Sequence, residues 1–304
     1  MKENSRDTLE LILSRLFDYA GMFPPAGRSF HEALKESASL PTSLKRPGML
    51  LSDLVLDIEH ARKLITTDLR THGFSRDISM CLLASETPQR TIEVATEILT
   101  TKRKDGLQVS ISFLEAKVAI EGISPLIEIF LPFTQKNSML LALEPDLSTP
   151  DWEATLKSTL SAIKGTGIAL KCRCSGPTGI GPERLSAAII ETCDNNTPFK
   201  VTGGLHHPIV ERERYDNKIG FLNLAAGVLL RRAEGAHLSH TRLVALLTNS
   251  SLRAITTGEI LAYDGISISY DQAAHAKSAA PFSIGSCSLH EPDADIERLF
   301  SRAT

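Results

Sequence analysis

Three short segments of the chain contain most of the residues that could take part in chemistry. They are residues 169–183, 198–208 and 282–292. Each begins with the apolar pattern of a strand and then turns to glycine, serine or proline, so its polar side chains lie where a strand meets the next loop. Proteins built on parallel strands bind their ligands at that edge of the sheet. We therefore expect the three segments to form one site.

Two lysines lie in the first two of these segments. In an extended strand, Lys171 shares one face with Arg173 and is opposite to Leu170 and Cys172, and Lys200 alternates with its neighbours in the same way. If the apolar faces pack against helices, both lysines project into the interior. Burial and a neighbouring cation both lower the pKa of a lysine, which leaves a neutral amine that attacks a carbonyl carbon. The alternative is that each lysine extends from a strand end to solvent or to a helix carboxylate.

Glycines follow two of the predicted strands. Gly203 and Gly204 come after one strand, and Gly285 precedes Ser286 at the end of the last one. Many barrel enzymes bind a phosphate with backbone N–H groups of the loops after strands seven and eight, where glycine permits close approach. The alternative is a simple turn. The residues that we expect to hold an anionic substrate, through its phosphate or carboxylate, are Arg173, Gly203, Gly204, Gly285, Ser286 and Cys287.

Two adjacent histidines, His206 and His207, precede Pro208. Either imidazole suits proton transfer at neutral pH or hydrogen bonding to a substrate oxygen. The alternative is a divalent metal ion bound by this pair, although adjacent residues of an extended chain point to opposite sides, so one of them at most would easily face the ion. The candidates for further metal ligands, from other strand ends, are Asp53, Glu115, Glu144 and His290.

A dense loop at residues 18–26 combines Asp18, Tyr19 and a Pro-Pro pair. One interpretation is that this loop closes one end of the fold or leads into the first strand. The other places Asp18 or Tyr19 at the site as a proton carrier. We keep both residues as catalytic candidates, beside the lysines and the histidines.

Helical and strand-like segments alternate along the chain. The expected strands are 48–54, 78–84, 107–114, 126–131, 139–143, 168–173, 199–202 and 282–284. The expected helices are 7–17, 29–40, 58–69, 88–101, 151–163, 182–193 and 219–233. About eight mostly apolar strands separated by helices favour an α/β fold of the (β/α)8 TIM-like barrel class over an open sheet. The helix at 7–17 is an extra N-terminal one.

Residues 1–304 are expected to form one domain, because no repeat, low-complexity tract or glycine-rich linker divides them. About 80 residues separate the last two predicted strands, whereas one barrel repeat needs only about 30. We therefore expect a helical insertion at 209–280. It would serve as a lid or as the contact of a homo-oligomer.

The composition excludes several classes of function. With 33 Lys and Arg against 36 Asp and Glu, the formal net charge is −3, which offers no general attraction to nucleic acid or to an anionic membrane. No apolar run approaches the roughly 20 residues of a membrane span, and the polar start does not resemble a signal peptide. The five cysteines are an odd number. We expect a cytoplasmic protein with reduced thiols whose partner is a small anionic metabolite.

Two resemblances rest on these segments. Residues 18–26, 171–176, 198–208 and 285–288 resemble an uncharacterised bacterial protein family that shares the patterns DYAGxFPPA, KxR, PFKxTxGLHHP and GSCS, a resemblance that implies no activity. Residues 165–290 also resemble class I aldolases of the deoxyribose-phosphate aldolase type. Those barrels have a Schiff-base lysine on strand six, a second lysine followed by Gly-Gly on strand seven, and a phosphate loop after strand eight. Lys171, Lys200 with Gly203-Gly204, and Gly285-Ser286 follow that order.

The chain also departs from the aldolases. Cys172, Arg173 and Cys174 stand where that family has small hydroxyl residues, and neither the histidine pair nor the long insertion belongs to its pattern. The resemblance implies a lyase in which Lys171 or Lys200 is the amine and no cofactor is needed. The first alternative is a metal-dependent hydrolase or lyase that uses His206 and His207. The second is a non-catalytic barrel that binds a small anion or serves in an assembly.

Overall fold

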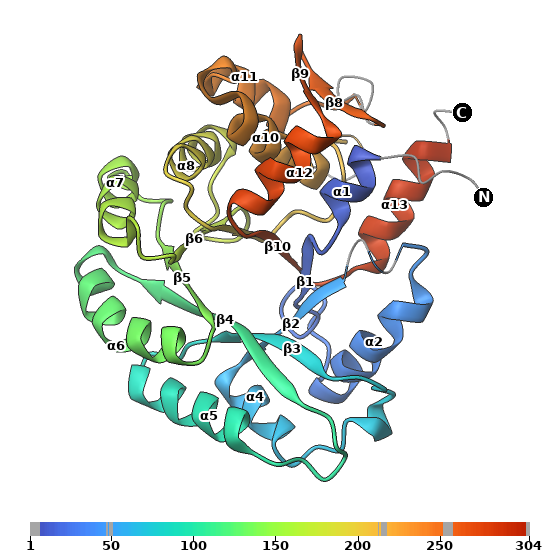
Figure 1. The fold of residues 1–304 in the computed structure, drawn as a ribbon, viewed down its shortest axis with the longest axis vertical. Helices are drawn as coiled ribbons and strands as arrows, with labels where there is room; N and C mark the ends of the chain where they lie inside the picture. The colour runs from blue at the N-terminus through green and yellow to red at the C-terminus, as the bar shows by residue number, and fades with distance from the viewer. Residues whose placement is uncertain are drawn as a thin grey trace.

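Eight parallel strands close into a barrel with helices outside it in the computed structural model of the chain (Figure 1). The structure describes residues 7–46, 48, 51–211, 213, 218–251 and 258–301. Around the barrel the strands follow the order β1, β10, β7, β6, β5, β4, β3, β2. Their bounds are β1 Phe17–Tyr19, β2 Leu51–Asp57, β3 Ile78–Leu83, β4 Val109–Val118, β5 Leu140–Pro145, β6 Ala169–Arg173, β7 Phe199–Thr202 and β10 Phe282–Ser286. The prediction of a (β/α)8 TIM-like barrel is confirmed.

The helices begin where local sequence signals place them. Ser29 forms a capping box at the start of α2, the Asp57 carboxylate caps α4, and Pro88 and Pro182 are the first residues of α5 and α8. The helix bounds are α1 Thr8–Leu13, α2 Phe30–Ser43, α4 Ile58–Leu64, α5 Pro88–Thr100, α6 Ile123–Lys136, α7 Trp152–Ile163, α8 Pro182–Asp194, α10 Phe221–Glu234, α11 His240–Leu247, α12 Tyr270–Ala279 and α13 His290–Ser301. None of the described helices has both the length and the apolar character to cross a membrane.

Alternate residues of the strands face the outer helices or the barrel interior. Leu170 and Cys172 of β6, like Phe199 and Val201 of β7, belong to the large core between strands and helices. A small apolar cluster fills part of the interior and consists of Val55, Cys81, Phe113, Ala142 and Ala169. The period of two in each strand therefore divides the side chains between two cores.

The two lysines face the interior, as the alternation predicts. Lys171 and Lys200 are opposite each other in the parallel register of β6 and β7, and Arg173 is opposite Thr202. Both lysines are buried. The neighbouring strands thus place two amines at the same level of the barrel, and the interpretation of solvent-extended strand-end lysines is wrong.

One predicted strand is a helix. Residues 126–131 lie within α6, where Ile123, Phe130 and Thr134 are buried at helical spacing. A short apolar run cannot by itself distinguish a strand from a buried stretch of helix. The remaining barrel strand is β1, which has only three residues and overlaps the start of the segment 18–26. The expected strand 48–54 begins at Leu51, and residues 49 and 50 lie outside the described part.

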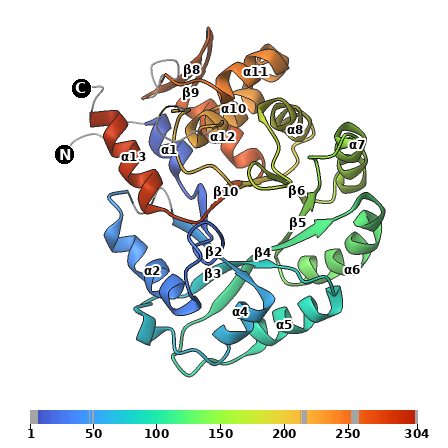
Figure 2. The same cartoon turned by 180° about the vertical axis from the view of Figure 1, so that it is seen from behind.

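The segment between β7 and β10 contributes helices to the outside of the barrel. It contains α10, α11, the antiparallel hairpin β8 (Ile260–Tyr263) and β9 (Ile266–Ser269), and α12. Every residue from Phe221 to Arg231 of α10 is buried, and α10 contacts α8, α11, α12 and α1. Figures 1 and 2 show this group of helices beside α8. The lid and the oligomer contact stay predictions.

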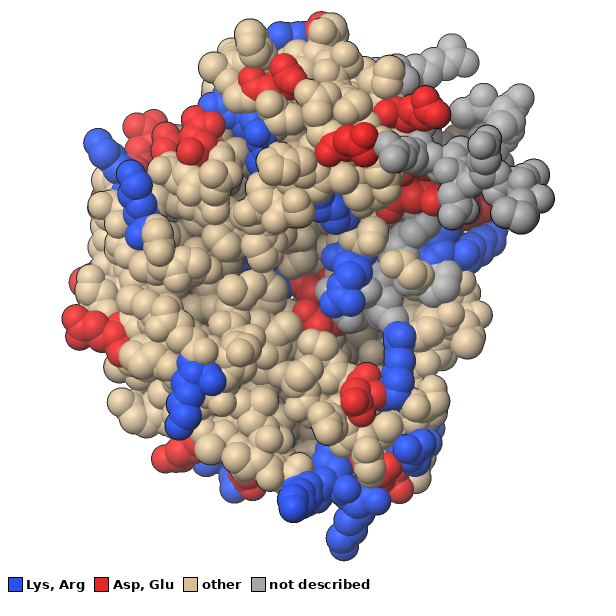
Figure 3. Space-filling view, in the orientation of Figure 1, with Lys and Arg blue, Asp and Glu red and all other residues tan. Residues whose placement is uncertain are grey.

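Charged side chains of both signs are interspersed on the face drawn in Figure 3. This distribution agrees with the formal net charge of −3. On this face the structure offers no extended basic surface among the residues it describes, which is the surface that nucleic-acid binding requires.

Leu170 gives a test of the outer core beneath the lysines. Leu170→Ala removes a fully buried side chain next to Lys171 and should lower the free energy of unfolding by about 2–5 kcal/mol. The control is Ile120→Ala, at a side chain that is 46% exposed, which should change it by less than about 0.5 kcal/mol. Urea denaturation measures both. Equal effects of the two substitutions would contradict the assignment of Leu170 to the core.

Candidate active site

A cavity of about 530 Å³ lies at the carboxyl ends of the barrel strands. Its lining comes from most of the barrel strands and from the segments that follow β1, β6, β7 and β10. The lining residues that the sequence predicts are Asp18, Lys171, Arg173, Lys200, Gly203, Gly204, His206, Gly285 and Cys287. The fold therefore brings the three chemically rich segments and the start of the segment 18–26 to one place.

One carboxylate joins the two lysines. Glu115 of β4 accepts a hydrogen bond from Lys171 Nζ at 2.6 Å through Oε2, while its Oε1 lies 2.7 Å from Lys200 Nζ. The three side chains are each at most 7% exposed. A buried charge is tolerated when it is paired and hydrogen-bonded, so each group here depends on the others.

A second carboxylate extends this network toward the opening of the cavity. Glu144 of β5 places Oε2 2.7 Å from Lys171 Nζ, and its Oε1 accepts a hydrogen bond from Arg173 Nε at 2.7 Å. The Arg173 side chain is 30% exposed, whereas that of Glu144 is 7% exposed. Arg173 is therefore the end of the network that a ligand reaches first.

Lys200 is enclosed more completely than Lys171. Its ammonium group donates to Asp18 Oδ2 at 2.7 Å, lies 3.3 Å from Cys81 Sγ and sits 4.0 Å from the ring centroid of Phe113. Asp18 Oδ2 also accepts a hydrogen bond from Ser283 Oγ at 2.7 Å. These contacts hold the Lys200 amine in place and favour a supporting role for it.

The expectation of lowered lysine pKa values is wrong. Burial lowers the pKa of Lys171, but the carboxylates of Glu115 and Glu144 outweigh it and raise that pKa above its ordinary value. Burial likewise lowers the pKa of Lys200, and Asp18 and the other anions around it raise it well above the ordinary value. For Glu115 burial raises the pKa, yet the two ammonium groups bring it down to about 2. At neutral pH both lysines of the free protein are charged.

A cluster of three candidate metal ligands occurs among the described residues. Ligand atoms of Asp18, Asp53 and Cys81 lie within 4.8 Å of one another, and the buried Oδ1 of Asp53 has no hydrogen-bond partner. The Lys200 ammonium already supplies the positive charge here, since it contacts both Asp18 and Cys81. Burial raises the pKa of the Cys81 thiol well above its ordinary value, so a metal ion would have to displace both this proton and the Lys200 ammonium group. These residues do not fit a divalent metal ion.

The two histidines bind different carboxylates of α13. His206 lines the cavity, and its Nδ1 lies 3.1 Å from Glu291 Oε2, whereas His207 Nδ1 lies 2.6 Å from Asp295 Oδ2. Their ring centroids are 6.4 Å apart. Neither belongs to a three-ligand cluster among the described residues. Burial lowers the pKa of His206, so its imidazole is neutral at neutral pH.

Three of the predicted site residues do not line the cavity: Tyr19, Ser286 and His207. Tyr19 is buried, and its hydroxyl donates to Glu36 of α2 at 2.7 Å, on the helix side of the barrel wall. The hydroxyl of Ser286 donates to the Ser288 carbonyl oxygen at 2.6 Å. The side chain of Asp18, next to Tyr19, faces the cavity instead, as the alternation of a strand requires.

The Gly203-Gly204 pair meets a steric requirement. Both residues have positive φ angles, of 82° and 74°, and a Cβ atom at Gly203 would lie 2.4 Å from Ser175 Oγ. Only glycine accepts this backbone without strain. The loop after β7 therefore approaches the segment after β6 closely and exposes its backbone to the cavity.

Sequence reasoning considered Glu115 and Glu144 only as metal ligands and left Lys117 out. Glu115 shares the inward face of β4 with Phe113 and with Lys117, which is exposed and also lines the cavity. The expected strand ended at residue 114, whereas β4 continues to Val118. The period of two that located Lys171 would have located Glu115 if the strand had been extended.

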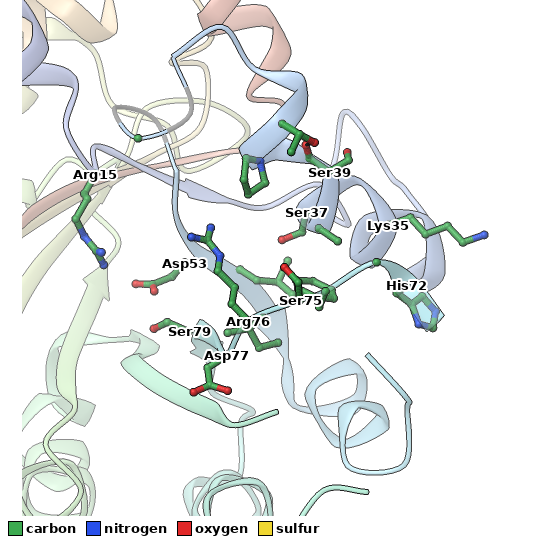
Figure 4. A pocket seen from close by; sticks show the side chains of 18 of the residues that line it. Arg15, Lys35, Ser37, Ser39, Asp53, His72, Ser75, Arg76, Asp77 and Ser79 are labelled. Carbon is green, nitrogen blue, oxygen red and sulfur yellow. Dashed lines mark hydrogen bonds between the residues drawn. The ribbon is translucent and has the colours of Figure 1, made fainter. Parts of the chain in front are cut away.

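A second, larger cavity of about 1030 Å³ lies at the opposite end of the barrel. It is lined near the amino ends of β2 and β3, where Figure 4 shows Arg15, Arg76 and Asp77 around Asp53 and Ser79. Conserved chemistry in barrel enzymes is located at the carboxyl end. The paired lysines and carboxylates line the smaller cavity, which is therefore the candidate active site.

The Glu115 bridge gives a stability prediction. Glu115→Gln leaves two buried ammonium groups with one carboxylate fewer, so the free energy of unfolding should fall by roughly 3–5 kcal/mol. The matched control is Glu121→Gln, at an exposed glutamate of the same chain, which should change it by less than about 0.5 kcal/mol. Chemical denaturation at pH 7 measures both, and equal values would contradict the bridge.

The same carboxylate predicts a dependence of stability on pH. The pKa of Glu115 is about 2 in the folded protein against 4.5 for an ordinary glutamate. Its stabilising charge is therefore fully present above pH 4.5 and is lost as the pH falls toward 2. The free energy of unfolding should fall over this interval more steeply for the wild type than for Glu115→Gln. Parallel pH profiles would contradict the lowered pKa.

The geometry of the site is the basis for any functional assignment, because comparison with known proteins identifies no relative. The geometry consists of a buried pair of lysines, three carboxylates that hold them, and an arginine at the opening. A barrel fold alone hosts many unrelated reactions. No protein-family model matches the sequence, and no curated protein is significantly similar to it.

Proposed function

We propose that the protein is a lyase of the aldolase type, in which Lys171 forms a Schiff base with a small carbonyl compound that bears a phosphate or a carboxylate. The observation that carries this proposal is the position of Lys171 Nζ, 2.6 Å from Glu115 and 2.7 Å from Glu144, in the cavity at the carboxyl end of the barrel. A carboxylate in contact with a buried amine can accept the proton that the amine must lose before it adds to a carbonyl carbon. The order of Lys171 and Lys200 along the chain agrees with the resemblance to class I aldolases.

Lys171 must lose a proton before it can attack. Glu144 accepts this proton. An anionic group of the substrate that pairs with Arg173 competes with Glu144 for the guanidinium group, and this competition frees the Glu144 carboxylate to act as the base. Once Nζ is neutral, it forms a C–N bond with the carbonyl carbon, and the carbonyl oxygen takes one proton from Nζ and one from Glu144 and leaves as water. The product is an iminium ion on Lys171. Binding of the anion and activation of the amine are thereby coupled.

The iminium ion then accepts electrons from the carbon–carbon bond. A carboxylate removes the proton of the β-hydroxyl group, the bond between the α- and β-carbons breaks, and its electron pair forms an enamine with the iminium nitrogen. The β-carbon leaves as an aldehyde. Glu144 is the base of choice, since an anion on Arg173 frees it from one of its two cations, whereas two ammonium groups hold the pKa of Glu115 at about 2. His206, neutral and at the cavity wall, can take up a proton from solvent and deliver it as an imidazolium ion to the enamine carbon.

The remaining lining residues bind the substrate. Arg173 is the cation of the network that a ligand can reach, and Gly203, Gly204 and Gly285 allow an oxyanion to approach the backbone. Lys200 supplies a fixed positive charge beneath the reacting carbons. All five cysteines are free thiols, and we place the reaction in the reducing cytoplasm.

No specific observation favours the metal-dependent alternative. His206 and His207 are hydrogen-bonded to different side chains, and the Asp18, Asp53 and Cys81 cluster already contains the Lys200 ammonium. The second alternative is a non-catalytic barrel that binds an anion. The following experiment distinguishes it from the proposed lyase.

Borohydride trapping tests the Schiff base. The protein is treated with sodium borohydride and a panel of aldehydes and ketones that carry phosphate or carboxylate, and adducts are located by peptide mass spectrometry. We expect a reduced adduct at Lys171. Lys171→Arg keeps the charge between Glu115 and Glu144 but cannot form the adduct, and should lower carbon–carbon cleavage by more than about 10³-fold.

Lys277 is an internal control for this experiment. Burial lowers its pKa to about 8, so this lysine is largely neutral at pH 9 although it lies in α12, outside the cavity. Adducts at Lys277 as frequent as those at Lys171 would indicate unspecific labelling. The absence of an adduct at Lys171 and Lys200 over the whole panel, with the anions still bound, would replace the proposal by the non-catalytic barrel.

A further inference from the structure

A cysteine, a histidine and a glutamate lie in contact with one another at the wall of the cavity. Cys287 follows β10, His206 follows the Gly203-Gly204 loop, and Glu291 lies in the first turn of α13. Cys287 Sγ is 3.6 Å from His206 Nε2, and His206 Nδ1 is 3.1 Å from Glu291 Oε2. Cys287 Sγ also lies 4.0 Å from His206 Nδ1, so the thiol is beside the ring and nearer to Nε2, while the Glu291 carboxylate contacts Nδ1.

The reaction proposed for Lys171 uses neither the thiol nor the carboxylate of this row. Cys287 is 7% exposed and lines the same cavity as Lys171. Cys174, by comparison, is a free thiol without an imidazole among its described hydrogen-bond partners. A nucleophile, a base within hydrogen-bond reach and a third group that orients the base are the parts of an activated thiol.

We propose that Cys287, His206 and Glu291 form a second reactive centre of the cavity, in which the thiol adds reversibly to an aldehyde. His206 Nε2 takes the thiol proton while Sγ forms a bond to the aldehyde carbon. The electron pair of the carbonyl π bond moves to the oxygen, which then takes the proton back from His206. The product is a hemithioacetal, and neither partner is oxidised or reduced.

The protonation states in the free protein suit this order of events. Burial raises the pKa of the Cys287 thiol, against the opposing effects of backbone N–H groups and of Arg28, and Glu291 raises it further. Burial and the neighbouring His207 lower the pKa of His206, while Glu291 raises it. A neutral thiol therefore faces a neutral imidazole, and Glu291 stabilises the imidazolium ion that forms during the addition.

The identity of the electrophile rests on the proposed lyase function. Cleavage next to a Schiff base releases an aldehyde into a cavity that Cys287 and Lys171 line together. Cys287 would retain this aldehyde as a hemithioacetal while the enamine is still bound to Lys171. The substrate class of the centre is therefore a short aldehyde, and the reactivity of the thiol can be measured without any lyase activity.

Alkylation with iodoacetamide, followed residue by residue with mass spectrometry, tests the activated thiol. The rate at Cys287 should follow deprotonation of His206 and become constant above about pH 7. The control thiol is Cys174, whose pKa burial raises to about 12, so its rate should keep rising with pH. His206→Gln should lower the alkylation rate of Cys287 by about 10²-fold at pH 7, and this rate should then keep rising with pH.

Two results of this alkylation would overturn the activated thiol. One is a rate at Cys287 no higher than that at Cys174. The other is a rate and pH profile unchanged by His206→Gln, with the fold checked by circular dichroism. Glu291→Gln tests the positioning role of Glu291. It should lower the alkylation rate of Cys287 by a smaller factor than His206→Gln does, and the rate should still become constant at high pH.

Protection by acetaldehyde tests the electrophile. Acetaldehyde should slow alkylation of Cys287 in the wild type and equally in Lys171→Arg, which cannot form a Schiff base. Protection that disappears in Lys171→Arg would show that a lysine adduct covers the thiol, and would overturn the aldehyde assignment. Failure of borohydride trapping at Lys171 concerns the lyase alone, since the alkylation rates do not depend on it.

Discussion

The Glu115 carboxylate between two buried ammonium groups is the interaction on which the site depends. Glu115 comes from β4, and Lys171 and Lys200 come from β6 and β7. Closure of the barrel brings these strands around one interior, where water does not screen the charges. Removal of any member leaves an uncompensated charge in a protein interior, which is far more costly than the loss of a surface ion pair. Each side chain of the network therefore depends on the others for its stability in the interior.

This constraint changes the chemistry expected of the lysines. A lysine among cations would be a neutral amine before the substrate arrives, whereas Lys171 among carboxylates is an ammonium ion with a raised pKa. Its activation must then accompany substrate binding. Arg173 provides the connection, because it shares Glu144 with Lys171 and is the part of the network exposed to the cavity.

The sequence predicts those features that follow from the local pattern of one strand or helix. Period-two alternation places Lys171 and Arg173 on the inner face of β6, and the alternation of strands and helices predicts the barrel. The strand expected at 126–131 is wrong because a short apolar run fits a buried helix equally well. The three-residue strand β1 is too short to give a periodic signal of its own.

The partners of the lysines could not be predicted with the same certainty. Glu115 lies 56 residues from Lys171 along the chain, and Asp18 lies 182 residues from Lys200. Which carboxylate meets which lysine over such separations depends on the register of the strands in the closed barrel. No local sequence pattern predicts that register. For this reason the sequence suggests a cationic site and a lowered lysine pKa, although carboxylates surround both amines.

The ionisation of the two lysines tests this account most directly. Lysine labelled with ¹³C at Cε and ¹⁵N at Nζ reports the charge of each amine by nuclear magnetic resonance, and Lys171→Arg and Lys200→Arg assign the signals. We predict that both amines of the free protein stay protonated beyond pH 10.5, the ordinary lysine value, and that Glu115→Gln lowers both pKa values. Titration of either amine below that pH in the wild type would contradict the carboxylate bridge.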